Sequence, residues 1–257
     1  MIEKLFEELS ALPQVEAIAL GGSRAGTAFD DKSDYDVYVY CVEEIDKEVR
    51  TKLLSRYCSY MEIGNSYWET EDNCTLNNGI DIDILYRNLD SLVADIASVA
   101  EQFNARNGYT TCMWHNLKTC KIVFDRNGRL QQAKQRFDVP YPEQLRANII
   151  KRNMNLLHDA MPAYDAQILK ALKRSDYISI NHRTAAFFES YFDILFAFNR
   201  LTHPGEKRLV QLCKRDCTVL PRDFESNINK VLSEMFVNPE SLTDNLKTIV
   251  NNLKDIL

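Results

Sequence analysis

Residues 20–40 hold a glycine turn that is followed by two closely spaced aspartates. The chain reads Leu20-Gly21-Gly22-Ser23-Arg24-Ala25-Gly26 and then, after a short interval, Ser33-Asp34-Tyr35-Asp36-Val37-Tyr38-Val39-Tyr40. Glycines let backbone N–H groups approach a phosphate closely, and a helix that begins after such a turn adds a favourable dipole. The β-branched and aromatic run after Asp34 predicts a strand. This stretch therefore predicts a site for a nucleoside triphosphate with a divalent metal.

The spacing of Asp34 and Asp36 suits metal binding. Side chains alternate along a strand, so the two carboxylates project from one face, roughly 7 Å apart. Two negative charges at this spacing are costly unless a cation lies between them. Mg²⁺ prefers carboxylate and water oxygens and leaves positions open for substrate phosphates. We therefore predict that both aspartates are metal ligands, and the alternative is a solvated pair at a turn or strand edge.

A second pair of aspartates lies in Ile80-Asp81-Ile82-Asp83-Ile84-Leu85-Tyr86. The period-two alternation predicts a strand with its isoleucines on one face and its aspartates on the other. If this strand lies beside residues 34–36, one aspartate completes a cluster of three carboxylates. That carboxylate would bind metal or act as general base toward an acceptor hydroxyl. The residues alone leave Asp81 and Asp83 as alternatives.

The order G-G-S-(x)10-D-x-D, followed by an aspartate between apolar residues in a later strand, resembles the nucleotidyltransferase superfamily. That superfamily includes polymerase-beta-like enzymes and the kanamycin and streptomycin nucleotidyltransferases. The resemblance covers roughly residues 15–86. It implies that Gly22 and Ser23 form the phosphate-binding turn, that Asp34 and Asp36 bind metal, and that Asp83 is the third carboxylate. Aligning the last strand one step differently favours Asp81.

The tract Tyr191–Arg208 is similar to one in a bacterial group of nucleotidyltransferase-domain proteins whose acceptor is unassigned. This resemblance implies a two-domain enzyme of the antibiotic-modifying type. In related enzymes a lysine of the helical domain reaches the triphosphate, which implies that role for Lys207, and the alternative is a surface charge at a helix N-terminus. Arg24 has two open interpretations, a charge-assisted phosphate contact or a structural ion pair.

Periodicity divides the chain into a mixed half and a helical half. Strands and helices alternate up to a boundary near Tyr141-Pro142, and only helical patterns follow. We therefore expect an α+β protein, with an N-terminal nucleotidyltransferase domain (1–140, a mixed sheet flanked by helices) and an all-α C-terminal domain (141–257). Residues 61–78 show no clear pattern beyond a hairpin connection at Asn77-Asn78-Gly79. The other predicted elements are helices over 2–12, 45–60 and 89–107 and strands over 15–20, 35–42 and 121–125.

Composition narrows the class of partner. The 257 residues include 31 basic and 37 acidic side chains, for a net charge of −6. This balance, without an extended basic stripe, disfavours nucleic acid as a substrate and RNA tailing as a function. No apolar run approaches the roughly 20 residues that span a bilayer, so no membrane partner is expected. The acidic N-terminus does not resemble a signal peptide, and the seven scattered cysteines predict reduced thiols in a cytoplasmic protein.

These observations favour a transferase that depends on two Mg²⁺ ions. The expected reaction moves a nucleoside monophosphate, AMP from ATP, to a hydroxyl of a small-molecule acceptor. The resemblance and the acidic surface together suggest an aminoglycoside-like acceptor. Two alternatives remain open: a protein-modifying (AMPylating) antitoxin-like transferase, which needs a protein partner, and a nucleotide-binding protein without turnover. The residues do not name the base, the acceptor or the oligomeric state.

Several other residues have an ordinary structural interpretation. His115 and His182 are single histidines without the spacing of metal ligands, and they predict packing or surface roles. His203 has the same two open interpretations as Lys207, a structural role or a contact to the triphosphate. An aromatic stripe has helical spacing and predicts a core face rather than a stacking platform for bases. Its members are Phe187, Phe188, Tyr191, Phe192, Leu195 and Phe196.

Overall fold

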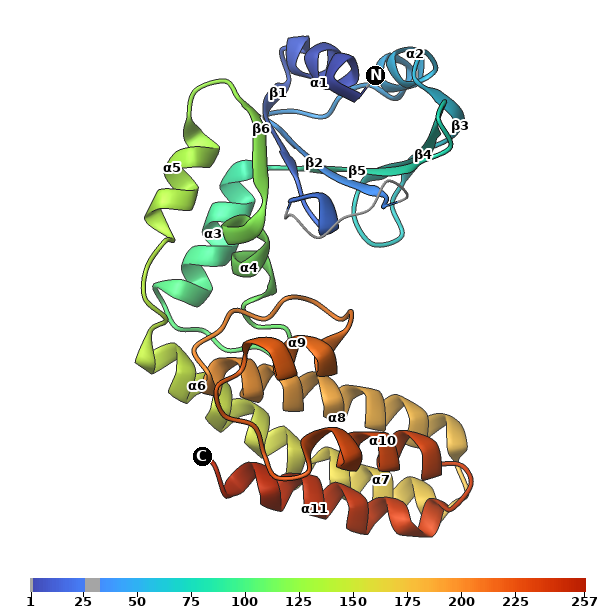
Figure 1. Ribbon diagram of the computed structural model, residues 1–257, viewed down its shortest axis with the longest axis vertical. Coiled ribbons are helices and arrows are strands. Elements are labelled where there is room, and N and C mark those ends of the chain that lie inside the picture. The colour runs from blue at the N-terminus through green and yellow to red at the C-terminus, as the bar shows by residue number, and fades with distance from the viewer. Residues whose placement is uncertain (1, 26–32) are drawn as a thin grey trace. The chain divides into compact units, whose positions relative to one another are not determined.

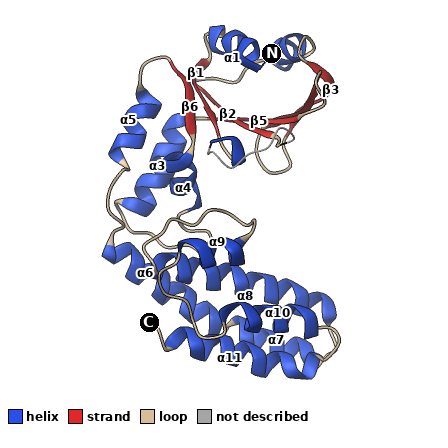
Figure 2. Ribbon diagram, viewed as in Figure 1, coloured by secondary structure: helices blue, strands red, loops and turns tan. Residues whose placement is uncertain are grey.

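The computed structural model describes residues 2–25 and 33–257 of the chain, and it divides into two compact units (Figure 1). Unit 1 comprises Met1–Ala97 and Asn116–Val139, and unit 2 comprises Ser98–His115 and Pro140–Leu257. All the strands among the described residues belong to unit 1, and unit 2 is helical (Figure 2). This is the α+β architecture that the sequence predicted. Segment 98–115, which we expected in the N-terminal domain, packs with the helices of unit 2.

Unit 1 is built on a mixed sheet of six strands in the order β3-β4-β5-β2-β1-β6. The two central strands β2 and β5 run parallel, and every other neighbouring pair is antiparallel. The sheet therefore brings the stretch around Asp36 next to the stretch around Asp83. The strands are β1 (Val15–Leu20), β2 (Tyr35–Cys41), β3 (Cys58–Asn65), β4 (Glu71–Leu76), β5 (Asp81–Arg87) and β6 (Lys121–Asp125).

The two faces of this sheet differ in chemistry. Helices α1 (Ile2–Ala11) and α2 (Lys47–Leu54) pack against one face and bury its apolar side chains (Figure 1). Ile82 and Ile84 belong to that core and are fully buried, whereas Asp81 is exposed and Asp83 is half-buried. The predicted separation of isoleucines from aspartates is confirmed. The polar side chains of β2 and β5 are left for the opposite face, because side chains alternate along a strand.

The helix predicted over 45–60 is wrong in its second half. Helix α2 ends at Leu54, and Cys58 already begins β3. That strand forms an antiparallel hairpin with β4, in which Met61 pairs with Cys74. The partners in this ladder belong to the following segment, Glu71–Leu76, so the helical spacing within residues 45–60 did not reveal them.

The helix predicted over 89–107 also ends early. Helix α3 covers Leu89–Ala100, and the chain leaves helical geometry at Phe103, whose φ is 60°, and again at Gly108, whose φ is 82°. Left-handed backbone cannot continue a right-handed helix. Two short helices that we did not predict follow, α4 (Cys112–Thr119) and α5 (Arg129–Arg136).

Unit 2 is organised around its longest helix, α8 (Tyr177–Phe198). The aromatic stripe of this helix lies in the core, where Phe187, Tyr191 and Phe196 are at most 2% exposed. The predicted core role of the stripe is therefore confirmed. The other helices of this unit after residue 140 are α6 (Glu143–Met154), a π-helical turn (Asn155–Asp159), α7 (Tyr164–Leu172), α9 (Leu209–Asp216), α10 (Phe224–Glu234), a 3-10 turn (Pro239–Ser241) and α11 (Leu242–Lys254).

Two whole-chain expectations can be compared with the structure. All seven cysteines lie in the described ranges and are free thiols, in agreement with the prediction of reduced cysteines. Among the described residues, no helix combines the length and the apolar character that crossing a bilayer would require.

Candidate functional site

Asp36 and Asp83 are direct neighbours in the sheet. The parallel register of β2 and β5 pairs Asp36 with Asp83, one step after Tyr35 pairs with Ile82. Residues that are paired in a ladder point to the same face of the sheet. Because Ile82 faces the buried helix side, both aspartates project from the opposite, polar face. Both side chains are half-buried there. The sheet thus places two carboxylates side by side from segments almost fifty residues apart in the chain.

The glycine turn lies directly against the Asp36 carboxylate. Gly22 has a left-handed φ of 55°, and a Cβ atom added to it would overlap with Oδ2 of Asp36. Gly21 donates its backbone N–H to the Asp36 carbonyl at 2.8 Å. A glycine is therefore required at Gly22 for both conformation and space. This contact joins the predicted phosphate turn to one of the predicted metal ligands.

The Tyr38 side chain packs against the glycine turn at Gly21. A Cβ atom on Gly21 would overlap with the Tyr38 ring, and the Tyr38 hydroxyl accepts a hydrogen bond from Asn116 Nδ2 at 2.7 Å. The guanidinium of Arg87 lies 4.2 Å from the centre of the same ring, and it forms a bidentate pair with Glu69 at 2.7 Å. Burial raises the pKa of Tyr38, so this hydroxyl stays neutral. The glycine turn therefore packs against a tyrosine side chain that is neutral and is held in place by Asn116 and Arg87.

Asn73 of β4 orients the second carboxylate. Its Nδ2 donates to Oδ1 of Asp83 at 2.8 Å, and its own Oδ1 accepts from Asn65 Nδ2 at 2.6 Å. The register of β4 and β5 pairs Asn73 with Asp83. A row of polar side chains therefore crosses three strands from Asn65 to Asp83. Hydrogen bonds of this kind fix the direction in which a carboxylate presents its other oxygen.

The structure separates the alternatives Asp81 and Asp83 by position. Asp81 is exposed at the start of β5, and its Oδ1 accepts from Thr75 Oγ1 at 2.8 Å. The residue in register with Asp36 is Asp83. Asp34 precedes β2 by one residue, and its side chain is exposed. Asp36 and Asp83 thus form the adjacent pair of carboxylates, with Asp34 and Asp81 toward the ends of their strands.

Arg24 interacts with backbone in this structure. Its Nε donates to the carbonyls of Ser33 at 2.8 Å and of Asp34 at 3.1 Å, and its guanidinium lies 3.8 Å from the centre of the Tyr35 ring. These contacts hold the start of β2 beside the short helical turn Ser23–Ala25. These contacts are structural, and the phosphate contact that was the other interpretation of Arg24 stays a prediction. The side chain of Ser23 lies outside the part of the chain that the structure describes.

The carboxylates at this face of the sheet are too few to hold Mg²⁺ by themselves, so part of the coordination would have to come from a bound substrate. Within the described ranges, no three His, Cys, Asp or Glu side chains lie together closely enough to hold a metal. Mg²⁺ is nevertheless commonly held by one or two carboxylates together with substrate phosphates and water. Asp36 and Asp83 supply the two carboxylates, and the Gly22 turn, whose glycine has a positive φ, lies beside Asp36. The residues present therefore fit a metal that arrives with a triphosphate.

The remaining predicted residues belong to unit 2. Lys207 is exposed in the turn before α9, and the structure gives it no partner among the described residues. Nδ1 of His115 lies 2.8 Å from the Thr202 hydroxyl, and His203 is fully buried between the rings of Tyr109 and Phe196. The contact of His115 is of the packing kind that was predicted for it. For His203, whose role was left open, the structure shows burial among aromatic rings.

Three supporting residues were missed by the sequence reasoning. Tyr38 follows Asp36 by two positions, so the period of the strand already placed it on the same face. Asn73 lies in the region 61–78, whose strands were not recognised, and no local signal connected it to Asp83. Asn116 reaches Tyr38 from α4, which was not predicted. Only the first of these had a signal in the sequence.

The chain was compared with protein-family models, curated proteins and solved structures. A family model described as a domain of unknown function (DUF4037) matches residues 110–209. None of the curated proteins compared with the chain matches it. Among solved structures, the chain is similar to a nucleotidyltransferase-like protein from Exiguobacterium sibiricum 255-15, with 12% identity and a TM-score of 0.44 over 100% of this chain and 74% of that chain.

Two further solved structures are similar at lower TM-scores. An aminoglycoside 6-adenyltransferase from Bacillus subtilis has 8% identity and a TM-score of 0.29, over 99% of this chain and 90% of that chain. A CCA-adding enzyme from Thermotoga maritima in complex with tRNA has 12% identity and a TM-score of 0.29, over 95% and 71%. The function proposed below rests on the residues of unit 1.

Proposed function

We propose that the protein transfers a nucleoside monophosphate from a nucleoside triphosphate, AMP from ATP, to a hydroxyl group of a small-molecule acceptor. One observation carries this proposal: the carboxylates of Asp36 and Asp83 are paired side by side, with the Gly22 turn against the first of them. Two adjacent carboxylates repel each other unless a cation is shared. A turn with a glycine at positive φ presents backbone N–H groups to an anion. A metal–triphosphate complex satisfies both requirements at once.

Each residue of the pair has a distinct role in the proposal. Asp36, held beside the turn, would bind the metal that accompanies the phosphates. Asp83, oriented by Asn73, would bind metal on the acceptor side or take the proton of the acceptor hydroxyl. Asp34 is proposed as a further ligand at the entrance of β2. Bound Mg²⁺ supplies positive charge against the triphosphate and the leaving pyrophosphate.

The reaction balances without any further reactant. A bond forms between the acceptor oxygen and the α-phosphorus, and the bond from that phosphorus to the bridging oxygen of the β-phosphate breaks. Pyrophosphate leaves with the electron pair of the broken bond. The acceptor proton passes to a carboxylate and then to water. The protein contributes orientation of the reactants and a fixed negative environment for the metal.

The acceptor proposed is a cationic, hydroxyl-bearing molecule of the aminoglycoside type. The net charge of −6 supports this choice, because an acidic surface attracts cations and repels polyanions. Lys207 is proposed as a contact to the triphosphate from the helical half. The predicted second Mg²⁺ ion remains part of the proposal.

The test uses the purified full chain with ATP labelled on the α-phosphate, Mg²⁺ and a panel of acceptors that contains aminoglycosides and neutral polyols. Labelled acceptor and free pyrophosphate are the expected products. Asp36→Asn and Asp83→Asn keep the size of the side chain but remove the charge. We expect each to lower the rate of transfer on the order of 100-fold or more, while the thermal unfolding midpoint changes little.

Asp81→Asn is the matched control, because Asp81 lies on the same strand and the same face. It should retain most of the transfer activity. The proposal is wrong if Asp36→Asn transfers label at the wild-type rate, or if the wild-type chain neither binds nor consumes ATP in the presence of Mg²⁺. Label on a co-purified protein, with none on any small acceptor, would instead favour the protein-modifying alternative.

A further inference from the structure

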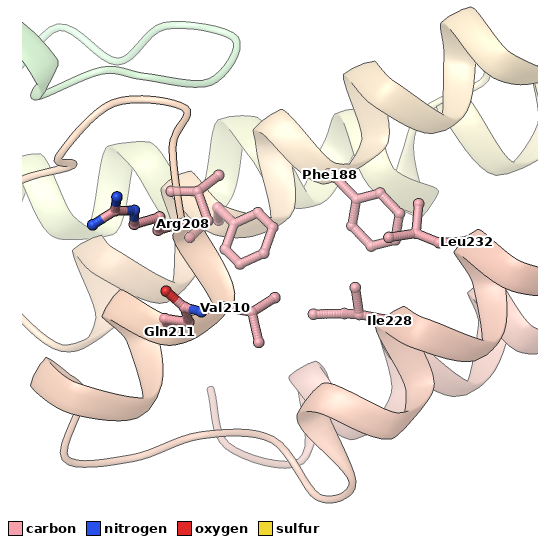
Figure 3. Close-up of a pocket in the computed structure, with 8 residues that line it drawn as sticks. Phe188, Arg208, Val210, Gln211, Ile228 and Leu232 are labelled. Atoms are coloured by element: carbon pink, nitrogen blue, oxygen red, sulfur yellow. The ribbon is translucent and has the colours of Figure 1, made fainter.

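Unit 2 contains a pocket whose walls come from α8, α9 and α10. Its volume is about 380 Å³, and its apolar wall includes Phe188, Val210, Ile228 and Leu232 (Figure 3). Pockets that hold small molecules typically begin at about 300 Å³ and combine apolar walls with a few polar groups. Leu232 is 53% exposed, so the pocket opens to solvent. The pocket shares no residue with the carboxylate site of unit 1, and its use does not depend on nucleotidyl transfer.

The polar groups of this pocket lie together at one side. Figure 3 shows Arg208 and Gln211 on one side of the space, and Phe188, Ile228 and Leu232 on the other. A ligand that fills the pocket would therefore have a polar end and an apolar end. This division limits the chemistry of the ligand, because a uniformly apolar molecule would leave the polar side unused.

Arg208 is placed at the pocket by an unusual backbone conformation. It precedes α9 with φ 58° and ψ 29°, in the left-handed region that costs a non-glycine residue roughly 1–2 kcal/mol. Its exposed guanidinium has no ion-pair or hydrogen-bond partner within the described part of the chain. The neighbouring cations Lys214 and Arg215 are paired with Glu225 and Asp216. Arg208 is thus a cation that is available to an incoming anion.

We propose that this pocket binds a small amphiphilic carboxylate, with its aliphatic part against Phe188, Ile228 and Leu232 and its carboxylate on Arg208 and Gln211. The guanidinium offers paired N–H groups that match the geometry of a carboxylate. The Gln211 amide adds a donor to the same group. Each methylene that enters the apolar part should tighten binding by about fourfold. Octanoate, which joins a flexible aliphatic chain to one carboxylate, is the probe.

The experiment follows methyl resonances of the full-length, methyl-labelled protein during titration with octanoate. We expect saturable shifts at Val210, Ile228 and Leu232 and none at Ile84, which is buried in unit 1. 1-Octanol has the same chain without the charge and should bind about fivefold more weakly, the effect of one exposed ion pair of about 1 kcal/mol. Octylammonium should bind more weakly still, because its charge faces Arg208.

Two pairs of variants separate the pocket from general surface effects. Arg208→Ala should weaken octanoate binding about fivefold, whereas Lys230→Ala, which removes a cation of α10 outside the pocket, should leave it unchanged. Leu232→Asp should abolish binding, whereas Val237→Asp, at a position 85% exposed, should not. All four positions are exposed, so folding is expected to be retained and is checked by thermal unfolding.

Three results would overturn the proposal. The first is octanoate binding that Arg208→Ala leaves unchanged. The second is octylammonium binding as tightly as octanoate. The third is the absence of saturable shifts at the pocket methyls in a wild-type chain whose unfolding curve is cooperative.

Discussion

Gly22 and Asp36 are in contact such that any side chain on the glycine would occupy the position of the Asp36 carboxylate. The turn and the strand are further joined by the hydrogen bond from Gly21 N–H to the Asp36 carbonyl. The phosphate turn and the metal ligand of the proposed site are therefore one structural element. A change in the turn should consequently alter metal binding even though the glycine has no metal-binding group of its own.

Gly22→Ala should displace the Asp36 carboxylate and reduce Mg²⁺-dependent ATP binding by about tenfold or more. Gly79→Ala is the matched control, because Gly79 also has a positive φ, 81°, but has open space where the methyl group would lie. Both variants should lose about 1 kcal/mol of stability through backbone strain. Titration calorimetry with Mg²⁺ and ATP separates them. Equal loss of nucleotide affinity in both variants would contradict the proposed coupling.

Asn73→Ala removes the hydrogen bond that orients Asp83. Loss of such an outer partner of a metal ligand typically lowers metal affinity or activity 10–100-fold. We therefore expect the Mg²⁺ concentration for half-maximal transfer to rise by about tenfold or more, a change that a merely structural role would not produce. Thr75→Ala removes the equivalent bond to Asp81 and should leave this concentration unchanged. The reverse outcome would move the third carboxylate to Asp81.

We predict that the titration of Asp193 lowers the free energy of unfolding as pH rises through the weakly acidic range. The side chain is 1% exposed, and burial raises the pKa of its carboxyl from 3.8 to about 6 despite hydrogen bonds from Thr110 and Asn153. The folded state therefore binds a proton more tightly than the unfolded state. The stabilisation is fully present below about pH 4 and is lost as pH rises through about 6, with a magnitude on the order of 1–3 kcal/mol.

Asp193→Asn tests this contribution by urea denaturation at several pH values. The variant cannot titrate at this position, so its free energy of unfolding relative to wild type should increase between about pH 4 and 6. A constant difference across that range would show that the wild-type carboxyl does not titrate there.

The titration of His203 should have the opposite effect: it should lower the free energy of unfolding as pH falls. Its ring is fully buried, and burial lowers the pKa of the imidazole from 6.5 to about 3. The Nδ1 atom accepts from the N–H of Gly205 at 3.2 Å, which requires a neutral ring. In the unfolded chain the ring gains a proton below about pH 6.5, so this contribution is present above that pH and is lost as pH falls toward 3.

His203→Phe removes this titration while retaining an aromatic ring beside Tyr109 and Phe196. Its unfolding free energy relative to wild type should improve as pH falls from about 6.5 to 4, from a starting value lowered by about 1 kcal/mol for the lost hydrogen bond. Because Asp193 and His203 act in opposite directions between pH 4 and 6, the wild-type curve should be flatter than that of either variant. A His203→Phe curve parallel to wild type would contradict this assignment.

The strands were the best-predicted part of the fold. Residues 15–20 and 121–125 form strands within the predicted limits, and the alternation of residues 80–86 assigned both faces of β5. The alternation of apolar and polar residues is a local signal, so it can be recognised in the sequence without knowing which strands are its neighbours. The hairpin of β3 and β4 was missed for the opposite reason. Its pairing is antiparallel between segments that show no clear alternation of their own, such as Glu71–Leu76.

For the proposed site, the sequence by itself supplied the candidate residues: the glycine turn, the paired aspartates and a second strand that offers Asp81 or Asp83. These are local patterns of residue type and spacing. Tertiary structure alone decided that Asp83 is the neighbour of Asp36, that Asn73 orients it, and that Arg24 holds backbone carbonyls in this structure. Register between β2 and β5 depends on the packing of their apolar faces against α1 and α2, which no short stretch of sequence contains.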